Sequence, residues 1–202
     1  MNKKTIFTKA RRKCRGRGGF SFVEALLATA IMLLMSLVMA SGVDFAVTQY
    51  HNAVIRSESK VLCSTLANIV RAELGNTGTI KPGERVNANT VKVDSFFSRT
   101  YANKASLSRF YSVTVDEYDN VKPASGYGEL LLGTEKDGVL VGKLLLSSAA
   151  YSTYHLGAKI GVTYDETREV FHVALSICGP DRKETLAETF DVIPLNDLAY
   201  VS

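Results

Sequence analysis

The sequence predicts an α+β protein in which one long N-terminal helix precedes a mainly antiparallel β-sheet. Three observations support this fold class. Residues 20–43 form an apolar run without Pro, helical periodicity continues to residue 74, and short β-branched segments separated by turn residues fill the rest of the chain. A helix followed by strands with short connections is typical of α+β folds. The chain is therefore expected to divide into four segments: a basic N-terminal segment (1–19), an apolar half of the helix (20–43), an amphipathic half of the helix (44–74) and a β-rich globular region (75–202).

The basic charge of the chain is concentrated at its N-terminus. Of 24 lysines and arginines, eight lie in residues 1–19, which contain no acid. The remaining 16 cations stand against 20 acids, so the body of the protein is acidic. Nucleic-acid binding by the body therefore lacks its main electrostatic basis. With 46% hydrophobic residues, the composition is that of a globular protein rather than a disordered chain.

Residues 25–43 are the uncharged centre of the apolar run. As an α-helix they span roughly 28 Å, close to the thickness of a bilayer core at about 30 Å. The positive-inside rule places the basic N-terminus in the cytoplasm and the rest of the chain outside. A secretory signal peptide has the same two regions, and a cut after Ala40 would suit one. Charge and hydropathy leave these two interpretations open.

Glu24 favours a membrane anchor over a signal peptide. It is the only charged residue in residues 20–43. A carboxylate inside an apolar span costs a few kcal/mol, so it indicates a functional site with a partner. Its surroundings read Gly18-Gly19-Phe20-Ser21-Phe22-Val23-Glu24, with a glycine before the apolar run and an aromatic residue at its start.

This stretch closely resembles the cleavage and methylation motif of type IV prepilins and type II secretion pseudopilins. In that family a basic leader ends in glycine, the next residue is usually Phe, and the fifth residue after the cut is Glu. Gly19, Phe20 and Glu24 match these positions. The resemblance covers about 25 residues. It implies that a prepilin peptidase cuts between Gly19 and Phe20 and methylates the new amine of Phe20.

The resemblance also implies partners, a location and a fold. Glu24 would neutralise the Phe20 amine of a neighbouring pilin or pseudopilin subunit, because two buried charges are tolerable only when paired. The protein would be a single-pass protein of the cytoplasmic membrane and then part of a pilus or pseudopilus. Its fold would be a long helix packed on an antiparallel sheet. Many family members carry Pro where this chain has Ser41, so a proline kink is not expected, although Gly42 could loosen the helix.

Residues 44–74 are expected to form the amphipathic half of the helix. Apolar residues recur at spacings of three and four, which predicts one buried face: Val54, Ile55, Val61, Leu62, Leu66, Ile69, Val70 and Leu74. Gly75–Gly78 should end the helix. A helix from residue 20 to 74 would be roughly 80 Å long, too long for one small core, so its first half needs a membrane or partner helices.

A loop-rich stretch is expected over residues 75–105, with one short strand at 90–94, and the other strands are expected after it. The predicted segments are residues 90–94, 110–118, 128–132, 139–146, 158–164, 170–178 and 189–194. Asp137-Gly138 is a strong hairpin signal between two of them, and Asp165–Arg168 reads as a second short turn. Gly126–Gly128 reads as a further turn.

The other candidate residues do not predict a catalytic or metal-binding site. His51, His155 and His172 lack ligand spacing and are interpreted as structural; no metal or cofactor is expected. The absence of a CxxC pair argues against a zinc site. Cys63 and Cys178 could form a disulfide if the strand packs on that helix face, or remain as two buried thiols. No catalytic motif appears, so an enzyme is not expected.

The sequence thus predicts a minor pilin or pseudopilin subunit. It would serve a type IV pilus-like filament in secretion, adhesion, motility or DNA uptake. One alternative is a secreted or membrane-anchored binding domain with a signal peptide cleaved after Ala40. Another is a single-pass membrane enzyme whose site the sequence does not reveal.

Overall fold

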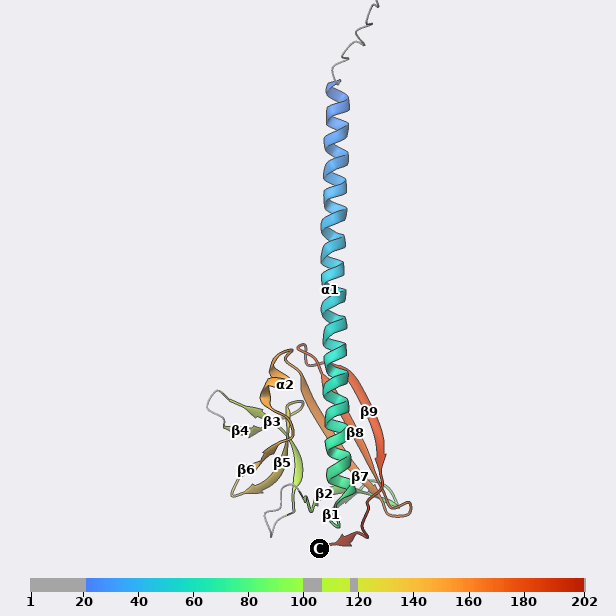
Figure 1. Ribbon diagram of the computed structural model, residues 1–202, viewed down its shortest axis with the longest axis vertical. Helices are drawn as coiled ribbons and strands as arrows, with labels where there is room; N and C mark the ends of the chain where they lie inside the picture. Colours follow the sequence, from blue (N-terminus) through green and yellow to red (C-terminus); the bar gives the residue numbers. More distant parts are fainter. Residues whose placement is uncertain (1–20, 100–106, 117–119, 202) are drawn as a thin grey trace, which may run out of the picture. The chain divides into compact units, whose positions relative to one another are not determined.

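The computed structural model describes residues 21–99, 107–116 and 120–201. It confirms the α+β class, because the helix α1 (Phe22–Gly75) is followed by a region of mostly antiparallel strands (Figure 1). The chain divides into two compact units, Met1–Gln49 and Tyr50–Ser202, with the boundary inside α1. Tyr50–Ser202 is called the globular unit below.

In the first unit, α1 begins directly after Ser21. The Ser21 carbonyl accepts hydrogen bonds from the backbone N–H groups of Glu24 (2.8 Å) and Ala25 (3.0 Å). The helix runs without a break through Ser41 and Gly42, so Gly42 does not interrupt it. Every residue from 21 to 49 is exposed. This part of α1 therefore has no core of its own in the described chain.

The described globular unit contains ten strands and a short helix. Their bounds are β1 (Thr79–Arg85), β2 (Thr90–Phe96), β3 (Arg109–Val115), β4 (Val121–Pro123), β5 (Glu129–Lys136), β6 (Val139–Leu144), α2 (Ser148–Ser152), β7 (Gly157–Asp165), β8 (Val170–Cys178), β9 (Glu184–Val192) and β10 (Ala199–Tyr200). They form two sheets rather than the single sheet expected. One has the strand order β10-β1-β2-β7-β8-β9, and the other has the order β4-β3-β5-β6. Only β1 and β10 pair in parallel among the described strands.

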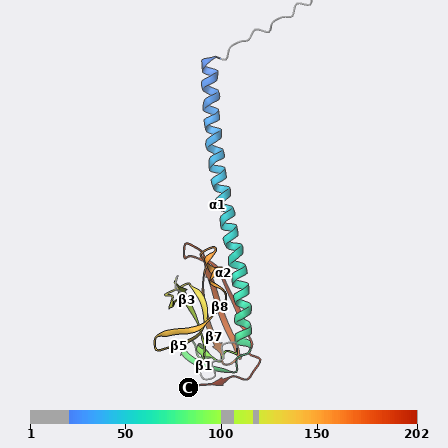
Figure 2. The same ribbon diagram turned by 60° about the vertical axis from the view of Figure 1, so that its left-hand side comes forward.

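The core lies between the second half of α1 and the sheets. One cluster joins Leu62 and Leu66 of α1 to Leu130 of β5 and to Leu175 and Ile177 of β8. A second cluster joins the last turns of α1 to β2, β8 and the end of β9. Figures 1 and 2 show this part of α1 running along β8. Burial of this apolar surface stabilises the unit by about 25 cal/mol per Å².

The buried face of α1 differs in part from the predicted one. Val61 is 58% exposed, so its assignment to the core was wrong. Ser59, Cys63 and Ala67 are fully buried instead. These three residues are four apart and form one row along the helix. Their small side chains allow the helix to lie close to the sheet, a feature that hydrophobicity alone does not reveal.

The β5–β6 hairpin forms where Asp137-Gly138 predicted it. Lys136 pairs with Val139, and both turn residues have positive φ, at 53° and 76°. Positive φ at both central positions defines a type I′ turn, which explains the glycine. The second predicted turn also forms, because the Asp165 carboxylate accepts hydrogen bonds from the N–H groups of Thr167 (2.9 Å) and Arg168 (3.0 Å).

Several strand predictions require correction. β1 was expected to be loop, because Gly, Asn, Ser and Thr are frequent in residues 75–105. The pairing of β1 with β2 shifts register at Pro82, which is how a sheet accommodates proline. The last long strand is β9, ending at Val192, and Pro194 lies beyond it. The short elements α2, β4 and β10 were not predicted. β3 ends at Val115, and part of its predicted extension lies outside the described residues.

Candidate functional site

Of the three residues that carry the prepilin resemblance, the structure describes Glu24. Gly19 and Phe20, like the whole basic leader, lie outside the described residues. Glu24 lies in the first turn of α1 and is exposed. An acid at this position interacts favourably with the helix dipole. By length and composition α1 could cross a membrane, and its most apolar window is not buried at all in the described structure.

Glu24 differs from the other polar residues in the apolar half of α1. The hydroxyl groups of Thr29, Ser36 and Ser41 donate to backbone carbonyls one turn earlier, at 2.9, 2.8 and 3.0 Å. The Glu24 carboxylate has no hydrogen bond or ion pair within the described residues. Three of the four polar side chains in residues 22–43 are therefore satisfied by the helix itself. Only the carboxylate requires a partner from elsewhere.

The disulfide that the sequence left open is not formed, because Cys63 and Cys178 are both free and buried. β8 does pack on α1, but through Leu175 and Ile177. Side chains alternate along a strand, so Cys178 faces away from the surface that contacts Cys63. The Cys63 thiol instead donates to the Glu188 carboxylate at 3.5 Å. Burial, followed by the Glu188 contact, raises the pKa of Cys63 to about 11.

The three histidines are separate. His51 is exposed on α1, and His155 follows α2. His172 lies on β8, with its Nδ1 atom 2.6 Å from the Asp191 carboxylate and its Nε2 atom 3.9 Å from Asp165. Among the described residues there is no group of three or more His, Cys, Asp or Glu side chains that could hold a metal ion.

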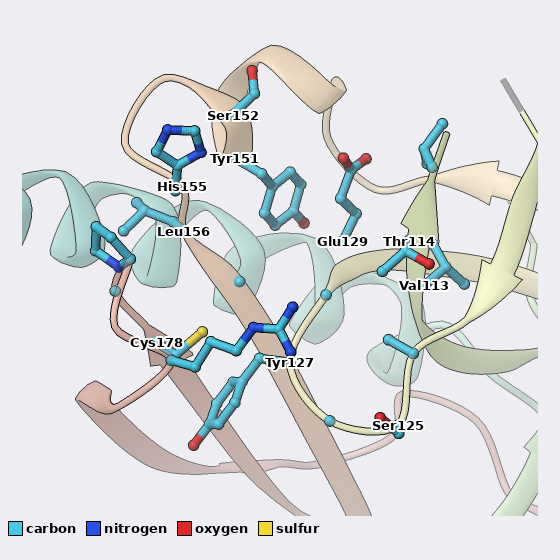
Figure 3. A pocket seen from close by; sticks show the side chains of 18 of the residues that line it. Val113, Thr114, Ser125, Tyr127, Glu129, Tyr151, Ser152, His155, Leu156 and Cys178 are labelled. Atoms are coloured by element: carbon cyan, nitrogen blue, oxygen red, sulfur yellow. The ribbon is translucent and has the colours of Figure 1, made fainter. Parts of the chain in front are cut away.

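The globular unit contains an open cavity of about 770 Å³ where its two sheets separate. Gly128 and Ala158 form an isolated bridge between the sheets, with backbone hydrogen bonds of 3.0 and 2.7 Å. A Cβ atom on Gly128 would lie 2.3 Å from the Val113 carbonyl oxygen, so this junction requires glycine. The cavity lies beside the junction, and Tyr127, Glu129, Tyr151 and His155 surround it (Figure 3).

Two residues of the cavity have a backbone conformation that favours glycine. His155 has a φ of 50° and follows α2, where the Leu156 N–H donates to the Tyr151 carbonyl at 2.8 Å. This is the left-handed position of a helix C-cap, which is usually glycine. Arg182 has a φ of 57° at the end of the β8–β9 turn, another position where glycine is usual. Each side chain is kept at a conformational cost of about 1–2 kcal/mol.

Sequence reasoning did not find this cavity. Its polar residues come from segments far apart in the chain, and none belongs to a short motif. His155 was interpreted as structural, and Gly126–Gly128 as a turn. The only indication of the cavity in the sequence is the residue type at one turn position, because Arg182 stands where glycine would be expected. That signal could be recognised only once the strand boundaries were known.

In comparisons with known proteins, no family model, no curated protein and no solved structure matches the chain. The fold and the site define a class only: an α+β protein with a long N-terminal helix, whose exposed, apolar first half could span a membrane, and a globular unit of two sheets. The prepilin resemblance rests on residues 18–24 and on this architecture.

Proposed function

We propose that the chain is a minor subunit of a type IV pilus-like filament, either a pilin or a pseudopilin. It is made with a basic leader, inserted in the cytoplasmic membrane with its N-terminus inside, and cut by a prepilin peptidase between Gly19 and Phe20. The amine of Phe20 is methylated, and the apolar half of α1 then packs against the helices of other subunits. The protein has no catalytic role in this proposal.

One observation carries the proposal: Glu24 is the only polar side chain of the apolar span without a partner in the described residues. An unpaired carboxylate among apolar side chains is costly, and a cleaved signal peptide has no use for one. The Phe20 amine of an adjacent subunit would supply the opposite charge. Exposure of every residue from 21 to 49 supports the same proposal, because such an apolar surface requires lipid or other helices to cover it.

The alternative is a binding domain released by signal peptidase after Ala40. α1 is helical on both sides of Ala40, and the Ser41 hydroxyl donates to the Val38 carbonyl across that position. A cut there would require this turn to unwind. It would also leave Glu24 without a role. The filament proposal accounts for both features.

The mature N-terminus tests the proposal directly. N-terminal sequencing of the membrane-bound protein should begin at Phe20, with a methylated amine. Gly19→Val should block cleavage, because the larger side chain would not fit a narrow peptidase cleft, whereas membrane insertion should persist. Ala40→Val is the matched control and should leave processing unchanged. A mature protein that begins at Ser41 would overturn the proposal in favour of the secreted domain.

A further inference from the structure

We propose that the cavity between the two sheets binds an acidic sugar, with the sugar carboxylate held by Arg182 and its hydroxyl groups by Glu129 and His155. This inference goes beyond filament assembly and does not depend on it. All the residues that line the cavity belong to the globular unit.

Arg182 supplies a cation that the described protein does not neutralise. Its neighbours in the β8–β9 turn form an ion pair with each other, with Lys183 Nζ 3.9 Å from Asp181 Oδ2. Arg182 forms no ion pair in the described chain. Arg182 itself lines the cavity, together with Cys178. A guanidinium group in this position is suited to a carboxylate, which it can bind with two parallel hydrogen bonds.

The other polar groups are suited to hydroxyl groups rather than to further anions. Glu129 accepts one hydrogen bond, from the Ser148 hydroxyl at 2.7 Å, and a carboxylate can accept several more. The Tyr151 hydroxyl accepts from the Leu130 N–H at 3.2 Å, and the residue as a whole is 2% exposed. Figure 3 shows Glu129, Tyr151, Ser152 and His155 around the same cavity. A phosphate-rich ligand is disfavoured by Glu129, and an apolar ligand by all of these groups.

The volume of the cavity and the backbone conformation of two lining residues support a ligand-binding role for the cavity. A volume of about 770 Å³ lies within the range of small-molecule sites, about 300–1,000 Å³, and accommodates a mono- or disaccharide. Four described non-glycine residues have positive φ, and two of them, His155 and Arg182, line this cavity. Glycine would be the less strained residue at both positions. Strained residues that persist in this way are typical of functional sites.

The test is calorimetric titration of the full chain in detergent micelles with galacturonic acid. Saturable binding is expected, with galactose, which lacks the carboxylate, binding at least about tenfold more weakly. Equal binding of both sugars would overturn the role of Arg182, and binding of succinate as tight as galacturonate would overturn the sugar. Absence of saturable binding would overturn the proposal. Digalacturonate distinguishes the source: tighter binding than the monomer indicates a polysaccharide, and equal binding indicates the free sugar.

Glycine variants separate binding from folding. Arg182→Gly and His155→Gly should weaken galacturonate binding by at least about tenfold while leaving the thermal midpoint unchanged or raised. Glu169→Gly is the matched control: it relieves the same backbone conformation, at a φ of 54°, in a turn that does not line the cavity. Lys183→Ala removes a cation from the same turn as Arg182. If either control weakens binding as much as Arg182→Gly does, the proposal is wrong.

A steric block provides a second, independent variant. A Cβ on Gly126 would meet nothing within 4 Å, and Gly126 lines the cavity, so Gly126→Leu should take up ligand space without a clash at its Cβ. Gly161→Leu is the control, because Gly161 is equally open but lies on β7 outside the cavity. Galacturonate binding should be lost in the first variant and kept in the second. Binding that is kept in Gly126→Leu and lost in Gly161→Leu would place the ligand outside this cavity and overturn the proposal.

Discussion

The two halves of α1 have the same secondary structure and opposite surroundings. From residue 21 to 53 every residue is exposed, although the sequence there is the most apolar in the chain. Between Ile55 and Gly75, ten residues are buried against the sheets. The second half is therefore stabilised by its own chain. The first half requires an apolar environment that the described chain does not contain. Within residues 22–43, Glu24 is the only polar side chain without a partner among the described residues.

The largest expected effect concerns the first half. Glu24→Ala should leave membrane insertion and cleavage after Gly19 unchanged, because it removes the cost of burying the acid and does not alter the cleaved bond. Incorporation into filaments should fall by a hundredfold or more, since an unpaired buried charge costs about 3–5 kcal/mol. The measurement is recovery of the protein in sheared filaments or cross-linked pseudopilus complexes.

Asp44→Ala is the matched control for Glu24→Ala. Asp44 is an exposed acid on the same helix, just beyond the apolar run. Its replacement should leave incorporation at the wild-type level. If Glu24→Ala assembles as well as wild type does, the pairing with the Phe20 amine is wrong, whatever the processing result.

A leucine pair tests the contrast between the halves directly. Leu66 is fully buried, whereas Leu34 is 67% exposed. Leu66→Ala should lower the free energy of unfolding of the globular unit by about 2–5 kcal/mol, through lost burial and a residual cavity. Leu34→Ala should change it by less than about 0.5 kcal/mol. Hydrogen exchange of the β8 amides in the full chain measures both. Equal losses would show that the first half also supports the globular unit.

The same contrast explains how much of the protein could be predicted from sequence. The long helix was predictable, because an uninterrupted apolar run and a period of 3.6 residues are local signals. The β5–β6 hairpin was also predictable, since Asp137-Gly138 fits only a few turn types. Both depend on neighbouring residues alone.

The rest depended on distant contacts. The burial of Ser59, Cys63 and Ala67 depends on how closely the sheet approaches the helix. Small side chains allow this close approach, but their presence in the sequence does not predict it. The cavity requires the two sheets to meet at Gly128 and Ala158, a contact between residues 30 apart in sequence. Glu24 could be singled out from sequence, whereas the satisfaction of the other polar groups in the span by the helix itself required the structure.

The smallest expected effect is a pH dependence of stability that arises in the second half of α1 and not in residues 22–43. Residues 22–43 contain no titratable group other than Glu24, whereas the packed half contains Cys63, with a pKa of about 11 against an ordinary value of 9.0. The folded state thus holds the thiol proton more tightly than the unfolded state. Its contribution to stability is complete below pH 9 and is lost as the pH rises from 9 to 11.

A comparison of variants isolates this contribution from other groups that titrate at high pH. The difference in thermal midpoint between wild type and Cys63→Ala should be constant below pH 9 and should shrink between pH 9 and 11. Glu188→Gln should reduce the shrinkage but not abolish it, because burial is the larger cause of the raised pKa and the Glu188 contact the second. A difference that stays constant to pH 11 would mean that the thiol environment differs from the one described. The loss of pH dependence in Cys63→Ala would place this part of the stability in the packed half of α1, where the helix faces the sheet.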